Sequence, residues 1–203
     1  MTEWPRALEG TTETVVTTLG PNDRWNAAAL GISAGAPVTA RTWGQTRTRR
    51  NFRREGEGYV QFVTDPELFV TAALGIHETT DPILEAAHAW VRVTVTRRTT
   101  GTTGGTEWAT WALEPVETSV VDRQVPALDR GLAAVVEATV AASRLTVPAY
   151  DRNTLESRLA HLASVVASCG GPAEQRAIRA VAAQSSWSPD ADVLPSAPGN
   201  ESF

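Results

Sequence analysis

The sequence contains no lysine, so all eighteen of its cationic side chains are arginines. A lysine Schiff base and the lysine of a P-loop phosphate site are therefore both excluded. Cysteine occurs once, at Cys169, which excludes a disulfide within the chain and fits a reducing compartment. No apolar run reaches the length of about eighteen residues that a transmembrane helix needs, so we expect no membrane partner.

The overall charge is acidic, at −5. Together with the many threonines and alanines and the missing lysine, this balance is similar to that of proteins from salt-loving archaea with GC-rich genomes. The first residues, Met1 to Pro5, lack the basic start and the apolar run of a signal peptide. We therefore expect a cytoplasmic, halophilic, archaeal protein.

Most of the first 120 residues have the pattern of short strands separated by turns, and the last third has the pattern of helices. Val91, Val93 and Val95 alternate with polar residues, as in a strand with one buried face. Asp65-Pro66-Glu67 combines a capping residue, a proline suited to the first turn and an acidic residue, which predicts a helix start. This order predicts an α+β protein, a small antiparallel barrel with a C-terminal helical cap.

The expected strands are 13–19, 26–32, 38–43, 58–64, 89–98 and 107–116, and the expected helices are 65–75, 127–145, 153–169 and 172–184. Segment 76–87 is ambiguous, 99–105 is expected to be a flexible hairpin loop, and Asn153-Thr-Leu-Glu156 resembles a capping box. These patterns predict a barrel domain at 1–122, a helical cap at 123–184 and a disordered tail at 185–203.

The segment Arg41–Arg54 holds six arginines in fourteen residues, a positive cluster in an acidic chain. A loop that leaves a strand can direct backbone N–H groups and threonine hydroxyls toward one phosphate, with arginine adding bidentate charge. Gly44 permits the tight turn that such a loop needs. The alternative is a solvated basic face, which on charge alone is the commoner outcome. The donors that we place at the phosphate are Thr46, Arg47, Thr48 and Asn51.

The other polar residues carry no catalytic or metal-binding signature. His77, His88 and His161 are widely separated, and none has a partner at metal-ligand spacing. No Gly-x-Ser-x-Gly motif is present. We therefore expect no metal site and assign no catalytic residue.

A charged strip with seven-residue spacing lies on the expected helix 127–145. It could face a ligand or a dimer partner, or it could form a structural ion-pair network that joins the helix to the barrel, and we favour the network. Its members are Arg130, Glu137 and Arg144.

Several short phrases stand in order along the chain. They are Glu13-Thr-Val-Val-Thr-Thr, Asn26-Ala-Ala-Ala-Leu-Gly-Ile, Thr48-Arg-Arg-Asn-Phe, Phe62-Val-Thr-Asp-Pro-Glu-Leu-Phe69, Asp129-Arg-Gly131 and Glu137-Ala-Thr-Val-Ala-Ala-Ser-Arg-Leu145. In this order they resemble an uncharacterised, largely archaeal family of FMN-binding split-barrel proteins. The resemblance covers roughly residues 10 to 180.

The resemblance implies a six-stranded antiparallel Greek-key split barrel that forms a homodimer, with FMN at or near the subunit interface. By position, Thr48 and Asn51 correspond to a turn that faces the FMN phosphate in such barrels. Arg47 and Arg49 are neighbours that could add charge, although Arg49 stands where an aromatic residue is common.

The resemblance also implies a contact with the flavin ring. Asn26, Ala27 and Ala28 correspond to the strand whose backbone lies near the isoalloxazine. Ala28 stands where proline is common in the family.

Three functions remain open at this point. The first is an FMN-dependent oxidoreductase of the flavin or small-molecule reductase or oxidase type, with a nicotinamide as a candidate electron donor. It suits a chain without an obvious acid, base or metal site, because the cofactor supplies the chemistry. The second is a non-enzymatic module that binds FMN or another phosphorylated ligand. The third is nucleic-acid binding through Arg41–Arg54, against which the acidic net charge argues.

Overall fold

The computed structural model describes residues 3–190 and 193–195. The chain divides into two compact units, one formed by residues 1–63 and 76–125 and the other by residues 64–75 and 126–203. Segment 64–75 therefore interrupts the first unit in sequence but belongs to the second. The predicted domain boundary after residue 122 stays a prediction.

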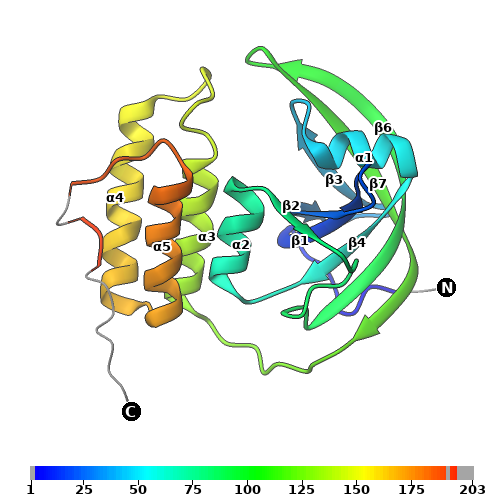
Figure 1. The fold of residues 1–203 in the computed structure, drawn as a ribbon, viewed down its shortest axis with the longest axis horizontal. Helices are drawn as coiled ribbons and strands as arrows, with labels where there is room; N and C mark the ends of the chain where they lie inside the picture. Colours follow the sequence, from blue (N-terminus) through cyan, green and yellow to red (C-terminus); the bar gives the residue numbers. More distant parts are fainter. Residues whose placement is uncertain (1–2, 191–192, 196–203) are drawn as a thin grey trace. The chain divides into compact units, whose positions relative to one another are not determined.

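The first unit is an antiparallel barrel of six strands with a seventh, short strand (Figure 1). Around the barrel the order is β1, β4, β6, β7, β3, β2, and pairing of β2 with β1 closes it. The short β5 pairs with β2 as well. The bounds are β1 (Thr11–Leu19), β2 (Trp25–Ser33), β3 (Val38–Trp43), β4 (Glu57–Phe62), β5 (His77–Thr79), β6 (Ala89–Thr103) and β7 (Thr106–Val120). The predicted α+β class and six-stranded barrel are confirmed.

Alternating apolar side chains fill the barrel. Val91, Val93 and Val95 are all buried in its core, as their spacing in the sequence predicts. Trp111 on β7 joins them and is 2% exposed. Burial of this apolar surface is the main stabilising contribution to the barrel.

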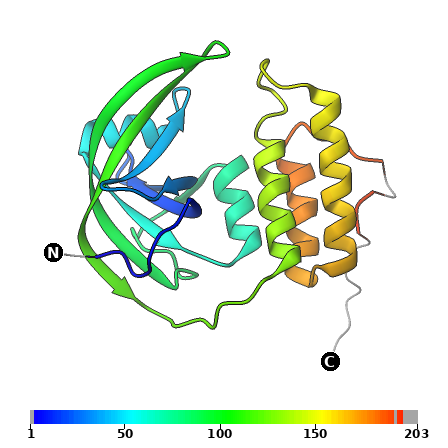
Figure 2. The same ribbon diagram turned by 180° about the vertical axis from the view of Figure 1, so that it is seen from behind.

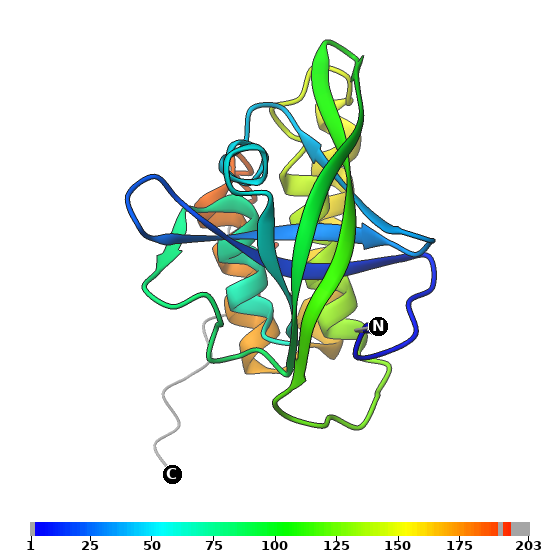
Figure 3. The same cartoon turned by 90° about the vertical axis from the view of Figure 1, so that its right-hand side faces the viewer.

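Strands β6 and β7 form one long hairpin (green in Figure 3), and the expected flexible loop at 99–105 is wrong. Pairing continues to Thr103 opposite Thr106, so the turn consists of Gly104 and Gly105. These glycines have φ values of 55° and 78°, and a tight hairpin turn with two positive φ angles favours glycine. The threonine-rich segment extends the strands because threonine favours extended backbone.

The tight turn expected at Gly44 is present, with a Gly44 φ of 62°, but the loop expected after it is wrong, because this segment folds into helix α1 (Arg47–Glu55). Thr46 caps this helix by accepting a hydrogen bond from the Arg49 backbone N–H at 3.2 Å. Phe52 is 1% exposed, lies in the barrel core and packs edge-on against a tryptophan ring at 5.4 Å between centroids. A buried face with a single large apolar residue gives no helical hydrophobic pattern, which is why the sequence did not predict α1.

The second unit consists of four helices that pack side by side (Figure 2). Their bounds are α2 (Pro66–Leu74), α3 (Arg130–Ala142), α4 (Arg152–Cys169) and α5 (Pro172–Gln184). A Cβ atom added to Gly131 would lie 2.7 Å from the Gly170 Cα, so α3 needs glycine where it meets the end of α4. Val70 of α2 is fully buried in the shared apolar core.

Helix α4 begins at a different residue from the one that the sequence indicates. Asp151 is its N-cap and accepts hydrogen bonds from the Thr154 hydroxyl at 2.6 Å and backbone N–H at 2.8 Å. These bonds lower the pKa of the Asp151 carboxyl below its usual value. The expected capping box at Asn153 is therefore wrong, because an aspartate two residues earlier takes the capping position.

Part of the predicted tail packs against the helices of this unit. Trp187 is 4% exposed and lies in their apolar core, and Arg152 donates a hydrogen bond to the Ser186 carbonyl at 2.6 Å. The polar composition of residues 185–203 did not predict this packing. Residues 191–192 and 196–203 of the predicted tail lie outside the described residues.

The charged strip of α3 does not form one network of its own members. Glu137 pairs with Arg158 of α4, and Arg144 lies over the ring of Tyr150 at 5.2 Å. Both contacts lie within the second unit, so they do not join α3 to the barrel as the ion-pair network was expected to do.

A buried glutamine fixes the segment between β5 and β6 to the barrel. Gln61 of β4 is fully buried and donates to the Thr17 hydroxyl and the Pro82 carbonyl, both at 2.9 Å. Its carbonyl oxygen accepts from the Leu84 backbone N–H at 2.7 Å. Gln61 thus supplies hydrogen-bond partners to polar groups that would otherwise be buried without them.

The change Gln61→Ala should lower the free energy of unfolding by about 3 kcal/mol, because it leaves buried polar groups without partners. Chemical denaturation measures the change. The matched control Gln45→Ala removes an exposed glutamine bonded to Glu107 and should change stability by less than about 0.5 kcal/mol. Equal effects of the two changes would contradict the role given to Gln61.

Candidate functional site

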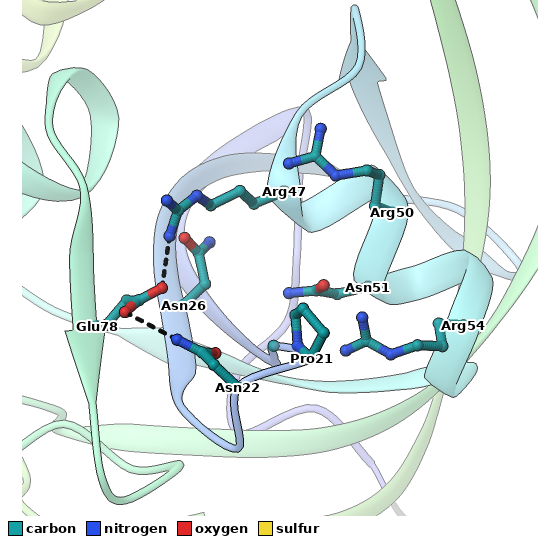
Figure 4. A pocket seen from close by; sticks show the side chains of 9 residues that line it. Pro21, Asn22, Asn26, Arg47, Arg50, Asn51, Arg54 and Glu78 are labelled. Carbon is teal, nitrogen blue, oxygen red and sulfur yellow. Dashed lines mark hydrogen bonds and ion pairs between the residues drawn. The ribbon is translucent and has the colours of Figure 1, made fainter.

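The first unit contains a polar cavity of about 420 Å³ beside α1 (Figure 4). This volume lies within the range of small-molecule sites. Side chains from α1, from the turn between β1 and β2, and from β5 surround it. The lining residues are Gly20, Pro21, Asn22, Asn26, Arg47, Arg50, Asn51, Arg54 and Glu78.

Helix α1 presents a row of three arginines to the cavity. Arg47, Arg50 and Arg54 follow one another at intervals of three and four residues, which places them on one helix face. Asn51 stands between them and is 3% exposed. Its amide donates to the hydroxyl of Thr18 on β1 at 3.0 Å and to the Thr18 carbonyl at 3.4 Å. This anchor fixes the direction of the arginine row.

Two of the guanidinium groups are held in place by the neighbouring backbone. Arg50 donates to the Gln45 carbonyl at 2.6 Å. Arg54 donates to the Leu19 carbonyl and pairs with Glu55. Each guanidinium has five N–H groups, so these bonds leave donors for an anion in the cavity.

One carboxylate also lines the cavity. Glu78 accepts from Arg47 through Oε1 at 2.5 Å and from the Asn22 amide through Oε2 at 3.3 Å. Its side chain is 28% exposed. The lining therefore carries three positive charges and one negative charge.

An asparagine with little exposed surface also lines the cavity. Asn26 of β2 is 6% exposed and lies beside Arg47 and Glu78 in Figure 4. Among the described residues, its side chain forms no hydrogen bond. Its amide is therefore free to bond with whatever occupies the cavity.

Three of the eight residues predicted for the site line the cavity, namely Asn26, Arg47 and Asn51. Thr46 instead caps α1, and Thr48 is buried at 4% exposure on the inner face of this helix. The side chain of Arg49 bonds to the Gly44 carbonyl at 2.9 Å and pairs with Glu107 at 3.3 Å.

The two predicted alanines of β2 do not line the cavity. Ala28 packs against the barrel core, and Ala27 is 2% exposed and pairs with His77 of β5. Their contacts with a cofactor stay predictions.

Within residues 3–190 and 193–195, no group of three or more His, Cys, Asp or Glu side chains could hold a metal ion. None of the helices in that part of the chain is long and apolar enough to cross a membrane. The cytoplasmic location, the halophilic character and the archaeal origin stay predictions.

Two family descriptions match the chain. "Protein of unknown function (DUF447) N-terminal domain" matches residues 12–122, and "Protein of unknown function (DUF447)" matches residues 129–182. The chain belongs to the DUF447 family. A comparison with curated proteins found no match.

A solved structure of the same family is similar to this DUF447 protein over most of both chains. It is the crystal structure of an FMN-bound protein from Methanosarcina mazei, with 25% sequence identity and a TM-score of 0.74. The likeness covers 87% of this chain and 96% of the other. The predicted resemblance to an FMN-binding split-barrel family with archaeal members is confirmed.

Two weaker likenesses involve the barrel fold. The flavin reductase HpaC complexed with NADP+ is 14% identical over 57% of this chain and 81% of its own, with a TM-score of 0.39. An FMN-binding protein from Thermus thermophilus with bound p-hydroxybenzaldehyde is 13% identical over 60% and 79%, also with a TM-score of 0.39. At these scores the two likenesses carry no argument about function.

The sequence analysis of this DUF447 protein missed Arg50, Arg54 and Glu78. The arginines could have been found from their helical spacing with Arg47, had α1 been recognised. Glu78 had no such signal, because β5 has only three residues and no apolar pattern.

Proposed function

We propose that this DUF447 protein binds FMN in the arginine-lined cavity and uses it in a redox reaction. The observation that carries the proposal is that three guanidinium groups and three amides line one cavity. Guanidinium groups form strong, charge-assisted hydrogen bonds with phosphate. An FMN molecule has one phosphate for the arginines and a hydroxylated chain for amides.

The residues present fit this cofactor. Arg47, Arg50 and Arg54 would hold the phosphate, and the unpartnered amide of Asn26 would find a partner in the flavin or its chain. Asn51 would act mainly by orienting α1. The FMN-bound relative from Methanosarcina mazei supports the assignment, since its fold covers nearly the whole of both chains.

The arrangement of the arginines favours this cavity over a nucleic-acid surface. Arg41 stacks over Trp43 at 5.7 Å and Trp108 at 4.5 Å, and Arg49 pairs with Glu107. With three further arginines turned to the cavity, the cluster does not form one continuous strip for a phosphate backbone.

The composition of the lining supports the redox part of the proposal. Apart from its arginines, Glu78 is the one ionisable side chain among the described lining residues. Bound FMN would supply the electron or hydride transfer, while the chain binds and orients it and controls access. A nicotinamide donor is part of this proposal.

Replacing both Arg50 and Arg54 by glutamine should weaken FMN binding about 10- to 100-fold, because hydrogen bonds between charged groups are lost. Binding of riboflavin, which lacks the phosphate, should stay within about twofold. Titration of the purified protein with each flavin, followed by flavin fluorescence, measures both values.

The matched control for this experiment is the double change Arg53→Gln with Arg98→Gln. It removes the same charge from two exposed arginines that do not line the cavity, and it should leave FMN affinity nearly unchanged. Equal losses in the two double variants, or equal losses of FMN and riboflavin, would place the phosphate elsewhere.

Reduction by a nicotinamide separates an enzyme from a binding module. The FMN-loaded protein mixed anaerobically with NADH or NADPH should lose its flavin absorbance near 450 nm, roughly the position typical of oxidised flavins. Rapid-scan absorbance measures the rate. A flavin that neither nicotinamide reduces would favour the non-enzymatic module.

We also propose the homodimer that the family resemblance implies. Trp43, Val116 and Val120 support it, because their apolar side chains are 45%, 42% and 48% exposed on the first unit. Light scattering after size-exclusion chromatography should give twice the chain mass of 21.7 kDa. A mass of one chain at micromolar concentration would contradict the dimer.

A further inference from the structure

Glu78 is a carboxylate in a cavity that otherwise attracts anions (Figure 4). Both of its oxygens are engaged, one by Arg47 at 2.5 Å and one by Asn22 at 3.3 Å. The carboxylate therefore points toward Arg47 and Asn22 at the edge of the cavity, with 28% of the side chain exposed.

The backbone around Glu78 is held from several sides. Glu78 pairs with Asn26 in the register of β5 and β2, and its carbonyl accepts a hydrogen bond from Arg24 at 3.4 Å. Farther along the chain, Gln61 fixes the segment through the Leu84 backbone N–H. These contacts thus hold Glu78 in a defined position at the edge of the cavity.

A fixed carboxylate affects ligands according to their charge. Without it, three arginines would attract pyrophosphate and nucleoside triphosphates more strongly than a monophosphate, because attraction grows with ligand charge. The negative charge of Glu78 repels anionic ligands, and this repulsion grows with each added ligand charge. It therefore opposes the stronger binding of polyphosphates. Specificity often arises from such a repulsive element.

We propose that Glu78 is a specificity-determining residue of this cavity. Its negative charge offsets the advantage that three arginines alone would give to ligands with two or more linked phosphates, so that a ligand with one phosphate monoester binds about as well as they do. The identification of the monoester as that of FMN rests on the proposed function, whereas the discrimination between anions does not.

Glu78→Gln tests the proposal, since it replaces the charged carboxylate by a neutral amide of the same size that can still form hydrogen bonds. Calorimetric titration with inorganic phosphate, pyrophosphate and tripolyphosphate should show similar affinities for the unchanged protein. In the variant, affinity should rise about threefold per added unit of ligand charge, so tripolyphosphate gains most.

Glu85→Gln is the matched control. It makes the same charge change at an exposed position on the segment that follows β5, outside the cavity lining. It should leave the ratio of affinities for pyrophosphate and phosphate as in the unchanged protein.

The proposal is overturned if Glu78→Gln leaves that ratio unchanged, if it weakens all three anions equally, or if neither protein binds any of them. An equal weakening would make Glu78 a support for Arg47 only. If FMN binds and the ratio does not respond, the inference about Glu78 fails alone. If FMN does not bind but the ratio responds, the proposed function fails and the role of Glu78 stands.

Discussion

The hydrogen bonds between the Asn51 amide and Thr18 are the contact on which the candidate site depends. Asn51 is buried, so its amide would be left without a partner in the protein if α1 moved away from β1. One residue along, Phe52 inserts into the barrel core. A polar bond and an apolar anchor on one helix turn thus fix how α1 lies on the barrel, and they fix the direction of its arginines.

The cavity lining carries three arginines, and one carboxylate reduces their positive charge. Because α1 turns Arg47, Arg50 and Arg54 toward one cavity, an acidic chain acquires a local cluster of positive charge. Glu78 reaches the site from β5, which adds to the barrel through β2. All lining residues belong to the first unit, so the helical unit is not needed to complete the lining described.

Much of the fold could be predicted because its burial pattern is regular. Val91, Val93 and Val95 alternate, and Asp65 caps a helix whose first residue is proline. Helix α1 could not be predicted in the same way, since Phe52 is the one large apolar residue on its buried face. The arginines drew attention to the right segment, but their shared face follows only from the helix.

Glu78 shows a second limit of sequence reasoning. Its place in the cavity depends on pairing between β5 and β2, which lie about fifty residues apart in the sequence, and no local pattern encodes this pairing. The predicted donors Thr46 and Thr48 occur in the right segment but support α1, one as its cap and one as part of its buried face. Which residues line the cavity therefore depends on long-range strand pairing and on the direction of each side chain.

The most direct test of the account is a crystal structure of this DUF447 protein with FMN bound. The account predicts that the phosphate oxygens lie within hydrogen-bonding distance of the guanidinium groups of Arg47, Arg50 and Arg54, with α1 still anchored through Asn51. A phosphate bound elsewhere on the chain, with this cavity filled only by water, would contradict it.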